Sequence, residues 1–544
     1  MVCPMFMSMV GSPLKGNVPQ GLASIFIIAQ TMQIARERNS IWFNRRLSFW
    51  SGGKILFWNI LSNLIGIDFS RGICYTYKEK TKNGFDFMKQ IFRRIFLSML
   101  CGLVLTSCVM EPPSIFEESS EGGAPESIAS SAEKGESSES NSSHEGEESC
   151  NDTEISLPPE ETMGTYVKAV WLSQYDMMSV YTADGKQRPA EEYLPLVKQV
   201  LENVAKDGYN TVIVQVRPFG DSMYPSELYP PSRYASGSYG KELEYDPFAL
   251  LISQAQALGL SVHAWINPMR LMKSAEIKQI GDGYQIKKWY DDEDAKGDLI
   301  AEVDGRWYLN PAHKEVRELI ADGAREICEK YAVDGIHMDD YFYPTTNASF
   351  DKLSYDAYKA AGGTMSLSKF RYENVNAMVR EIYAAVKSVD EDLLFGISPM
   401  GNLQQGYETL YTDVYTWCKE DGYIDYICPQ IYFGLEHQTH DFKSVYRTWK
   451  SIIKNDNVTL WAGMTLGKAQ SGVDNYAGSG KDEWKNHKDV LKRCLEYLED
   501  QEDCTGVVMF CYQYMYDPVT GKSVSETLEE RNNLKGALAV LGDS

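Results

Sequence analysis

From about residue 163 onward, short runs of apolar and β-branched residues alternate eight times with longer stretches of helical periodicity. Such runs are typical of buried strands, and helical stretches between them are the crossovers that parallel strands need. The runs are 167–172, 211–216, 261–266, 335–338, 393–397, 425–429, 459–463 and 506–510. Eight strands alternating with eight helices predict an α/β fold of the (β/α)8 TIM-barrel type.

The helical stretches cover residues 191–206, 247–258, 311–331, 367–389, 408–420, 440–453, 485–500 and 523–540. We expect the third to begin with Asn310 as its N-cap and Pro311 at its first helical position. A long polar insert, rich in Gly and Asp, follows the third strand and reaches Leu309. A doubly wound open sheet is the alternative. It is disfavoured because it would place a Gly-rich phosphate turn after the first run, and the residues there are Ser-Gln-Tyr-Asp176.

Residues 88–108 have the pattern of a bacterial lipoprotein signal. A cationic segment, 88–94, precedes an apolar segment, 95–105, that is too short to span a bilayer. The Leu-Thr-Ser-Cys108 that follows resembles a lipobox, which implies that Cys108 is lipidated. Because a signal belongs at the N-terminus, we expect the natural chain to start at Met88 and residues 1–87 to be an extension.

Residues 109–162 form a Ser/Glu-rich segment with 15 acidic residues and one basic residue, Lys134. Such a segment cannot bury enough apolar surface to offset its ordering entropy, so we expect a disordered linker. It would tether the barrel, residues 163–544, to a lipid anchor on Cys108. We therefore expect an extracytoplasmic protein held at the cell membrane.

The charge and the cysteines exclude two classes of function. The formal net charge is −23, and an acidic domain repels polyanions, so we expect no nucleic acid partner. The six cysteines beyond residue 163 form no Cys-x-x-Cys pair and have no His at zinc-site spacing. We therefore expect no metal site and no cofactor.

Carboxylates follow the strands at the end of the barrel where active sites of this fold lie. Glycoside hydrolysis needs two carboxyl groups, one to donate a proton and one to attack or to activate water. Asp339 and Asp340 end the fourth run. Adjacent strand residues point to opposite faces, so Asp339 shares the face of His337, and we expect it to be the nucleophile or stabiliser. The acid/base is Asp340, Asp221 in the loop after the second run, or Glu436.

Polar and aromatic residues at the same strand ends are candidates for binding a polysaccharide substrate. They are Arg217, Asn267, His337, Tyr341, Asn402, Gln430 and Tyr432. Each also has a structural interpretation. Arg217 could form an ion pair, His337 could be a satisfied core residue, and Asp221 could hold its own loop through side-chain hydrogen bonds.

At these residues the chain resembles glycosyl-hydrolase-like family 10, a family of bacterial lipoproteins. The matching stretches are 169–172, 208–211, 214–221, 264–268, 307–311, 334–344, 396–399 and 429–432. The resemblance implies a TIM barrel and a glycosidase that hydrolyses O-glycosyl bonds. Some members cut peptidoglycan glycan strands, so it also implies a cell-envelope substrate.

The segment Asp334-Gly-Ile-His-Met-Asp-Asp-Tyr341 is weakly similar to the Asp-Gly-x-Asp-x-Asp-x-Glu of family 18 chitinases. Here Tyr341 stands at the position of the catalytic glutamate, so that mechanism does not carry over. Two alternatives remain open. One is a carbohydrate-binding protein without activity on a glycosidase fold. The other is metal-assisted deacetylation or phosphoester cleavage with His263, His337 and Asp339.

Overall fold

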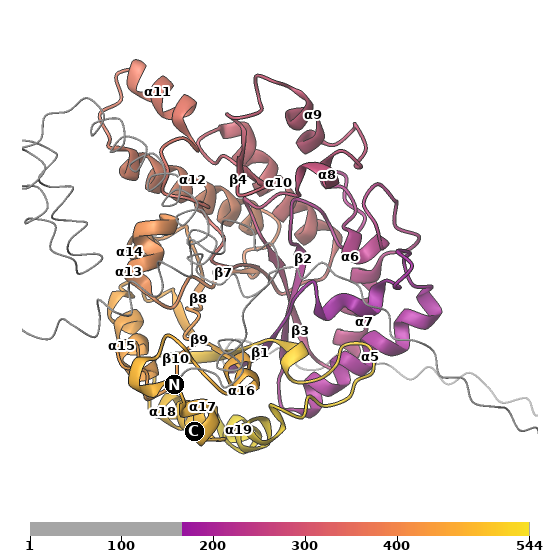
Figure 1. Ribbon diagram of the computed structural model, residues 1–544, viewed down its shortest axis with the longest axis vertical. Helices are drawn as coiled ribbons and strands as arrows, with labels where there is room; N and C mark the ends of the chain where they lie inside the picture. The colour runs from indigo at the N-terminus through magenta and orange to yellow at the C-terminus, as the bar shows by residue number, and fades with distance from the viewer. Residues whose placement is uncertain (1–165, 543–544) are drawn as a thin grey trace, which may run out of the picture. The chain divides into compact units, whose positions relative to one another are not determined.

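The computed structural model describes residues 166–542, which form a closed parallel barrel surrounded by helices (Figure 1). The predicted extension 1–87, the predicted signal 88–108 with Cys108, and the predicted linker 109–162 lie outside the described residues. No helix within the described part is long and apolar enough to cross a membrane.

The barrel has eight strands, and every predicted strand is present. They are β1 (Val167–Leu172), β2 (Thr211–Arg217), β3 (Ser261–Ile266), β6 (Gly335–Met338), β7 (Leu394–Ile397), β8 (Tyr426–Ile427), β9 (Thr459–Thr465) and β10 (Cys504–Phe510). Each strand pairs in parallel with the next one along the chain, and β10 pairs with β1. The TIM barrel is confirmed, and the open sheet is excluded because the sheet closes on itself.

The main helices also follow the predicted pattern. They are α5 (Ala190–Lys206), α7 (Pro247–Ala257), α10 (Lys314–Lys330), α12 (Leu367–Lys387), α15 (Phe442–Ile452), α18 (Val490–Glu499) and α19 (Leu528–Val540). Short helices occupy the loops. They are α6 (Arg233–Ser236), α8 (Ser274–Ile277), α9 (Gln285–Asp291), α11 (Lys352–Ala360), α16 (Gly467–Ser471) and α17 (Glu483–Asn486).

Two helix predictions are wrong in detail. The stretch 408–420 is no single helix, because Tyr411 adopts a left-handed φ of 58° and separates a π-helical turn from α14 (Val414–Trp417). Helix α10 has His313 as its N-cap rather than Asn310. The Asn310 side chain instead accepts a hydrogen bond from the backbone N–H of Ala312 and forms a turn before the helix.

The polar insert after β3 contains an antiparallel hairpin of β4 (Ile300–Val303) and β5 (Arg306–Leu309). Its turn residues, Asp304 and Gly305, have φ values of 50° and 79°. An Asp-Gly pair with two positive φ angles is the usual two-residue connection of a tight hairpin. The hairpin packs its backbone against the loop after β3, where the Leu309 N–H donates to the carbonyl of Met269.

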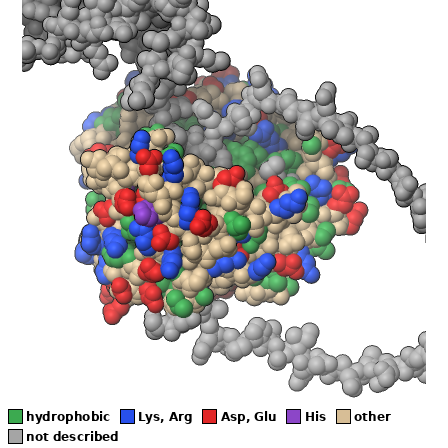
Figure 2. Space-filling model, turned by 60° about the horizontal axis from the view of Figure 1, so that its bottom comes forward, with side chains coloured by type: hydrophobic (Ala, Val, Ile, Leu, Met, Phe, Trp, Pro, Cys, Tyr) green, Lys and Arg blue, Asp and Glu red, His purple; other side chains and the backbone are tan. Residues whose placement is uncertain are grey.

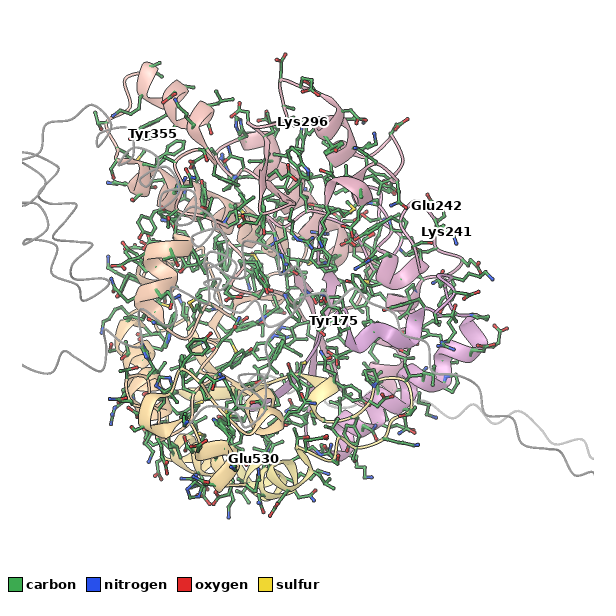
Figure 3. All side chains as sticks on the ribbon, in the orientation of Figure 1. Tyr175, Lys241, Glu242, Lys296, Tyr355 and Glu530 are labelled. Atoms are coloured by element: carbon green, nitrogen blue, oxygen red, sulfur yellow. The ribbon has the colours of Figure 1, made fainter. Side chains whose placement is uncertain are left out.

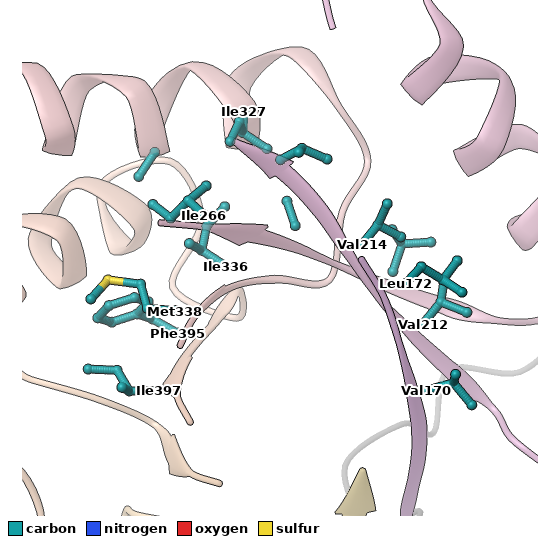
Figure 4. Packing of buried hydrophobic residues seen from close by; sticks show 14 of the residues in the cluster. Val170, Leu172, Val212, Val214, Ile266, Ile327, Ile336, Met338, Phe395 and Ile397 are labelled. Atoms are coloured by element: carbon teal, nitrogen blue, oxygen red, sulfur yellow. The ribbon is translucent and has the colours of Figure 1, made fainter. Parts of the chain in front are cut away.

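Alternate strand residues form an apolar layer between the barrel wall and the helices. It includes Val170 and Leu172 of β1, Val212 and Val214 of β2, and Ile336 and Met338 of β6 (Figure 4). Ile327 of α10 joins this layer from the helical side. All of these side chains are buried, so this layer supplies the hydrophobic stabilisation of the barrel.

The other strand residues form a column of aromatic and polar side chains inside the barrel. Tyr426 stacks on Trp461 with ring centroids 3.6 Å apart, and its hydroxyl lies 2.9 Å from Nδ1 of His337 and 3.0 Å from Nδ1 of His263. The Trp171 indole N–H donates to Nε2 of His337 at 3.1 Å. Because an indole can only donate, Nδ1 of His337 carries the proton and donates to Tyr426, whose hydroxyl donates to His263.

Burial keeps both histidines neutral. It lowers the pKa of His263 to about 4, and it lowers the pKa of His337 well below the ordinary value, with His263 adding to the effect. Gly396 leaves room for this column, since a Cβ there would lie 2.1 Å from the Tyr426 ring.

On the outside, acidic and basic side chains are interspersed over the face that Figure 2 shows.

One buried carboxylate holds two helices together. Glu530 of α19 accepts a 2.6 Å hydrogen bond from the backbone N–H of Leu491 in α18, and burial raises the pKa of Glu530 to about 7 (Figure 3).

Candidate active site

Asp339 lies at the carboxyl end of β6 and is only 3% exposed. Its Oδ2 accepts hydrogen bonds from the Asn267 side chain at 2.5 Å and from the Trp265 indole at 3.1 Å. Its Oδ1 accepts the backbone N–H of Tyr341 at 3.2 Å. All three neighbours are donors, so the surroundings of Asp339 suit an ionised carboxylate.

A relay of two side-chain amides reaches Asp339 from β1. The backbone N–H of Gln174 donates to Oε1 of Gln215 at 2.9 Å. The Gln215 amide then donates to Oδ1 of Asn267 at 2.6 Å, which leaves Nδ2 of Asn267 to donate to Asp339. Because a backbone N–H can only donate, it fixes the orientation of both amides.

Asp340 follows directly and is more open, with intermediate exposure. Strand β6 ends at Met338, so the strict alternation of a strand no longer holds at Asp340. The Gln430 side chain, from the segment after β8, hydrogen-bonds to its carboxylate. The Gln430 amide also donates to the carbonyl of Ser398 at 3.0 Å, which ties the ends of β7 and β8 to this carboxylate.

The two aspartates raise each other's proton affinity. Burial raises the pKa of Asp339, and the charge of the neighbouring Asp340 raises it further. Burial also raises the pKa of Asp340, against the opposing hydrogen bond from Gln430. Two carboxylates this close resist ionising together, so one of them retains a proton to higher pH than an ordinary aspartic acid.

A cationic side chain lies beside this pair. The Arg270 guanidinium carbon is 4.0 Å from the centroid of the Tyr341 ring and 4.9 Å from that of Phe219. Its charge lowers the pKa of both aspartates, although burial outweighs that effect.

Aromatic rings from β1, β8 and β10 border the same barrel end. The Tyr432 ring lies 6.5 Å from Trp171 and 5.7 Å from Phe510, and Phe510 lies 6.1 Å from Tyr514. Tyr432 and Tyr514 are both partly exposed. The charge of Asp340 contributes to raising the pKa of Tyr432, which links this group of rings to the aspartates.

Arg217 does not lie at the aspartate pair. A β-bulge between Gln215 and Arg217 breaks the register with β3, so the arginine leaves the interior side that Gln215 occupies. The Arg217 guanidinium donates to the Tyr224 hydroxyl at 2.7 Å and to the Gly323 carbonyl of α10 at 2.8 Å. It is 1% exposed and lies between the barrel wall and α10.

Asp221 is enclosed in its own loop. Its Oδ1 accepts the backbone N–H of Phe219 at 2.8 Å and its Oδ2 accepts the hydroxyl of Tyr239 at 3.2 Å. It is fully buried, and burial raises its pKa. This arrangement is the loop-holding alternative that the sequence left open for Asp221, and it does not bring Asp221 to the aspartate pair.

Three further candidates have structural partners. His337 lies below the pair in the interior column, with its two ring nitrogens hydrogen-bonded to Trp171 and Tyr426. Asn402 caps α13 (Leu403–Gln405) through the Gln405 N–H at 3.2 Å. Glu436 lies 3.5 Å from Nε2 of His487.

The structure thus gathers Asp339, Asp340, Asn267, Tyr341, Gln430 and Tyr432 at one end of the barrel. Sequence reasoning missed Gln215, although a single glutamine inside an apolar strand, in phase with Trp265 and His337, was a usable signal. Within residues 166–542 no group of three or more His, Cys, Asp or Glu side chains is arranged to hold a metal ion.

Comparison with known proteins identifies the family. The Glycosyl hydrolase-like 10 model matches residues 166–477. Glycosyl hydrolase YngK of Bacillus subtilis (strain 168) is 31% identical over 327 residues, which cover 57% of this chain and 62% of YngK. The match thus spans less than two thirds of YngK. Glycosyl hydrolase DigH of Escherichia coli (strain K12) is 26% identical over 401 residues, 68% of this chain and 89% of DigH.

Among solved structures, the PgaB (BpsB) glycoside hydrolase domain from Bordetella bronchiseptica aligns with a TM-score of 0.43 at 11% identity. That alignment covers 63% of this chain and 93% of the PgaB domain. The family match extends over more than half of the 544 residues and includes β1 to β9 with the aspartate pair. The chain therefore belongs to the Glycosyl hydrolase-like 10 family.

Proposed function

We propose that the protein is a glycoside hydrolase that cleaves the glycan strands of peptidoglycan, with Asp339 and Asp340 as its catalytic carboxyl groups. The observation that carries the proposal is the aspartate pair at the end of β6, enclosed by Asn267, Gln430 and Tyr432. Family membership, and relatives named glycosyl hydrolases, support the reaction class.

The surroundings of the two aspartates suggest different roles. Asp339 accepts three hydrogen bonds and is nearly inaccessible, so its anionic form stabilises or attacks the anomeric centre. Asp340 has fewer donors and is more open, so it holds the shared proton and delivers it to the leaving oxygen. Asp221 is not assigned the acid/base role, because its carboxylate is occupied within its own loop.

The aromatic rings favour a polysaccharide. Tyr432 and Tyr514 are partly exposed and border the same barrel end as the aspartates. Flat aromatic faces provide large apolar contact area, which suits the apolar faces of pyranose rings. A chain of sugars could therefore lie over these rings with one glycosidic bond at the aspartates.

The predicted lipoprotein signal at residues 88–108 supports the choice of substrate. A lipid on Cys108 and a linker over 109–162 would hold the barrel outside the cytoplasm, next to the cell wall. The test is metabolic labelling with a palmitate analogue. We expect label on the wild-type chain and none on Cys108→Ala, and label on both proteins would refute the anchor.

The experiment that tests the activity is incubation of the full chain with intact peptidoglycan, with glycan strands stripped of peptides, and with chitin oligomers. Products are identified by mass spectrometry. We expect shortened glycan fragments from wild type and none from Asp339→Asn. Binding without any product from wild type would instead establish the alternative, a carbohydrate-binding protein without activity.

A further inference from the structure

A buried carboxylate lies where the first and the last strand of the barrel meet. Asp176 belongs to the loop after β1 and is 2% exposed. Its Oδ2 accepts the backbone N–H and the hydroxyl of Ser173, both at 2.7 Å. Its Oδ1 accepts the backbone N–H of Gln513, in the segment after β10, at 2.6 Å. Because β1 pairs with β10, Asp176 joins the two loops that follow these neighbouring strands.

The three donors require the ionised form of Asp176. Two of them are peptide N–H groups, which can only donate. An asparagine has one acceptor oxygen and would place its NH2 group against a peptide N–H. Burial raises the pKa of Asp176 to about 6, so the group is ionised at neutral pH although burial disfavours its charge. A buried anion whose hydrogen-bond donors are neutral costs stability, which indicates a role beyond packing.

The first effect of these hydrogen bonds is to fix the peptide group of Gln174. Gln174 lies inside a closed turn, because the Asp176 N–H also donates to the carbonyl of Ser173 at 2.9 Å. The residues on either side of Gln174 are thus tied to each other. The Gln174 N–H donates to Gln215 at 2.9 Å and so begins the amide relay to Asp339. The direction of that N–H depends on the turn that Asp176 closes.

The second effect concerns the aromatic border of the site. Gln513 is the middle residue of a short 3-10 helix, Tyr512–Tyr514, and its hydrogen bond to Asp176 holds that helix against the loop after β1. The Tyr514 ring is partly exposed and lies 6.1 Å from the ring of Phe510. One carboxylate therefore holds both the start of the relay and a ring at the edge of the proposed substrate site.

We propose that Asp176 is a positioning residue of the glycosidase, which couples the amide relay to Asp339 with the aromatic border at Tyr514. In this role it contacts neither the substrate nor the reacting atoms. It acts through Gln174 on one side and through Gln513 on the other. The rate of the chemical step depends on the first connection, and binding of the sugar chain depends on the second. This inference rests on the proposed function and deepens it.

The kinetic test is a double-mutant cycle on the full chain, with peptidoglycan glycan strands as the substrate. We expect Asp176→Asn to lower kcat roughly tenfold and to raise KM, whereas Gln215→Leu lowers kcat alone. Both changes act through the same relay, so the double variant should have the kcat of Gln215→Leu within about twofold. A role confined to stability predicts that the two losses of kcat multiply, and that result would overturn the inference.

Asp517→Asn is the matched control. Asp517 is an exposed carboxylate of the same segment after β10, and it accepts the backbone N–H groups of Val519 and Thr520 within its own turn. The substitution weakens this segment without touching the loop after β1, so kcat and KM should remain those of wild type. If Asp517→Asn loses as much kcat as Asp176→Asn, any weakening of the segment lowers the rate, and the inference is wrong.

A second measurement does not depend on activity. Hydrogen–deuterium exchange, followed by mass spectrometry, compares peptides over residues 173–176 and 511–516. At pH 7 we expect both to exchange roughly tenfold faster in Asp176→Asn, and a peptide over 434–440 to exchange as in wild type. Unchanged exchange in either of the first two peptides would refute the connection. If Asp176→Asn does not fold, Ser173→Ala replaces it and should give smaller changes of the same kind, because it removes one donor.

The outcome for the proposed function is separate. A wild-type protein that releases no glycan fragments refutes the hydrolase, and the exchange measurement then decides alone whether Asp176 joins the two loops. A wild-type protein that cleaves the strands, while Asp176→Asn keeps the full kcat and the same KM, refutes only the positioning role.

Discussion

The Arg217 guanidinium donates a 2.8 Å hydrogen bond to the carbonyl oxygen of Gly323, on the outer side of the barrel wall. The contact depends on the missing side chain of Gly323, because a Cβ there would lie 2.7 Å from Arg217 and 2.6 Å from Tyr229. Arg217 thus connects β2 to α10, away from the aspartate pair.

Arg217→Met should destabilise the fold without impairing substrate binding. The substitution removes charged hydrogen bonds to Tyr224 and Gly323, so we expect the free energy of unfolding to fall by about 3 kcal/mol. Chemical denaturation measures this, and Gly323→Ala should act in the same direction. Arg325→Met, on the exposed face of α10, is the control with little effect. A large rise in KM with unchanged stability would restore Arg217 as a substrate-binding residue.

Gln215→Leu should lower kcat with little change in KM. The substitution removes the hydrogen bond that holds the Asn267 oxygen, so the Asn267 amide is less firmly positioned to donate to Asp339. We expect roughly a tenfold loss, the size of one hydrogen bond to a charged group. Gln187→Leu is the matched control, because Gln187 is also buried and bridges Tyr245 and Glu244 far from the aspartates. It should cost stability and leave kcat unchanged, whereas equal losses of kcat in both variants would contradict the relay.

Asp339→Asn and Asp340→Asn should each reduce kcat by about 10²- to 10⁴-fold. The pH dependence of the residual activity of Asp340→Asn provides a second test. In the proposed mechanism Asp340 holds a proton while Asp339 is ionised, so Asp340→Asn should abolish the basic limb of the pH–rate profile, which reports loss of that proton, and leave the acid limb in place. A basic limb that persists in Asp340→Asn would show that Asp340 is not the acid.

The interior histidines should make the fold sensitive to mild acid. The pKa of His263 is lowered from 6.5 to about 4, so between those values the unfolded chain binds a proton that the folded chain excludes. The stability from this site is complete above pH 6.5 and is lost as pH falls toward 4, by about 3 kcal/mol. Unfolding curves of His263→Gln should depend less steeply on pH than wild type. His487→Gln, at the surface, is the control that should follow wild type.

The spacing of the apolar runs and the alternation of side chains along each strand predicted the barrel well. Apolar runs separated by helical stretches were sufficient for eight strands, and the shared parity of His337 and Asp339 agrees with their hydrogen bonds to the interior residues Trp171 and Trp265. The hairpin of β4 and β5 was missed because a four-residue strand has little periodicity. Its Asp304-Gly305 turn was the available signal.

The candidate site was harder to predict than the fold. Arg217 stood at a strand end, but a bulge that no local pattern reveals turned it outward. Asn402 also follows a strand, and sequence alone does not separate a helix-capping asparagine from a substrate-binding one. Arg270 follows the third strand, yet its contacts with Phe219 and Tyr341 bring together segments that are distant in the sequence.

All hydrogen bonds of the amide relay run in one direction, and neither amide side chain fixes that direction by itself. Gln215 and Asn267 could each rotate by half a turn at little intrinsic cost, and two groups break that symmetry in the same sense: the peptide N–H of Gln174, which can only donate, and the ionised carboxylate of Asp339, which can only accept. The dipoles of both amides therefore point their positive ends toward Asp339. Part of the electric field at the carboxylate is set by the backbone of the loop after β1, so changes in that loop alter the chemistry without touching the aspartates.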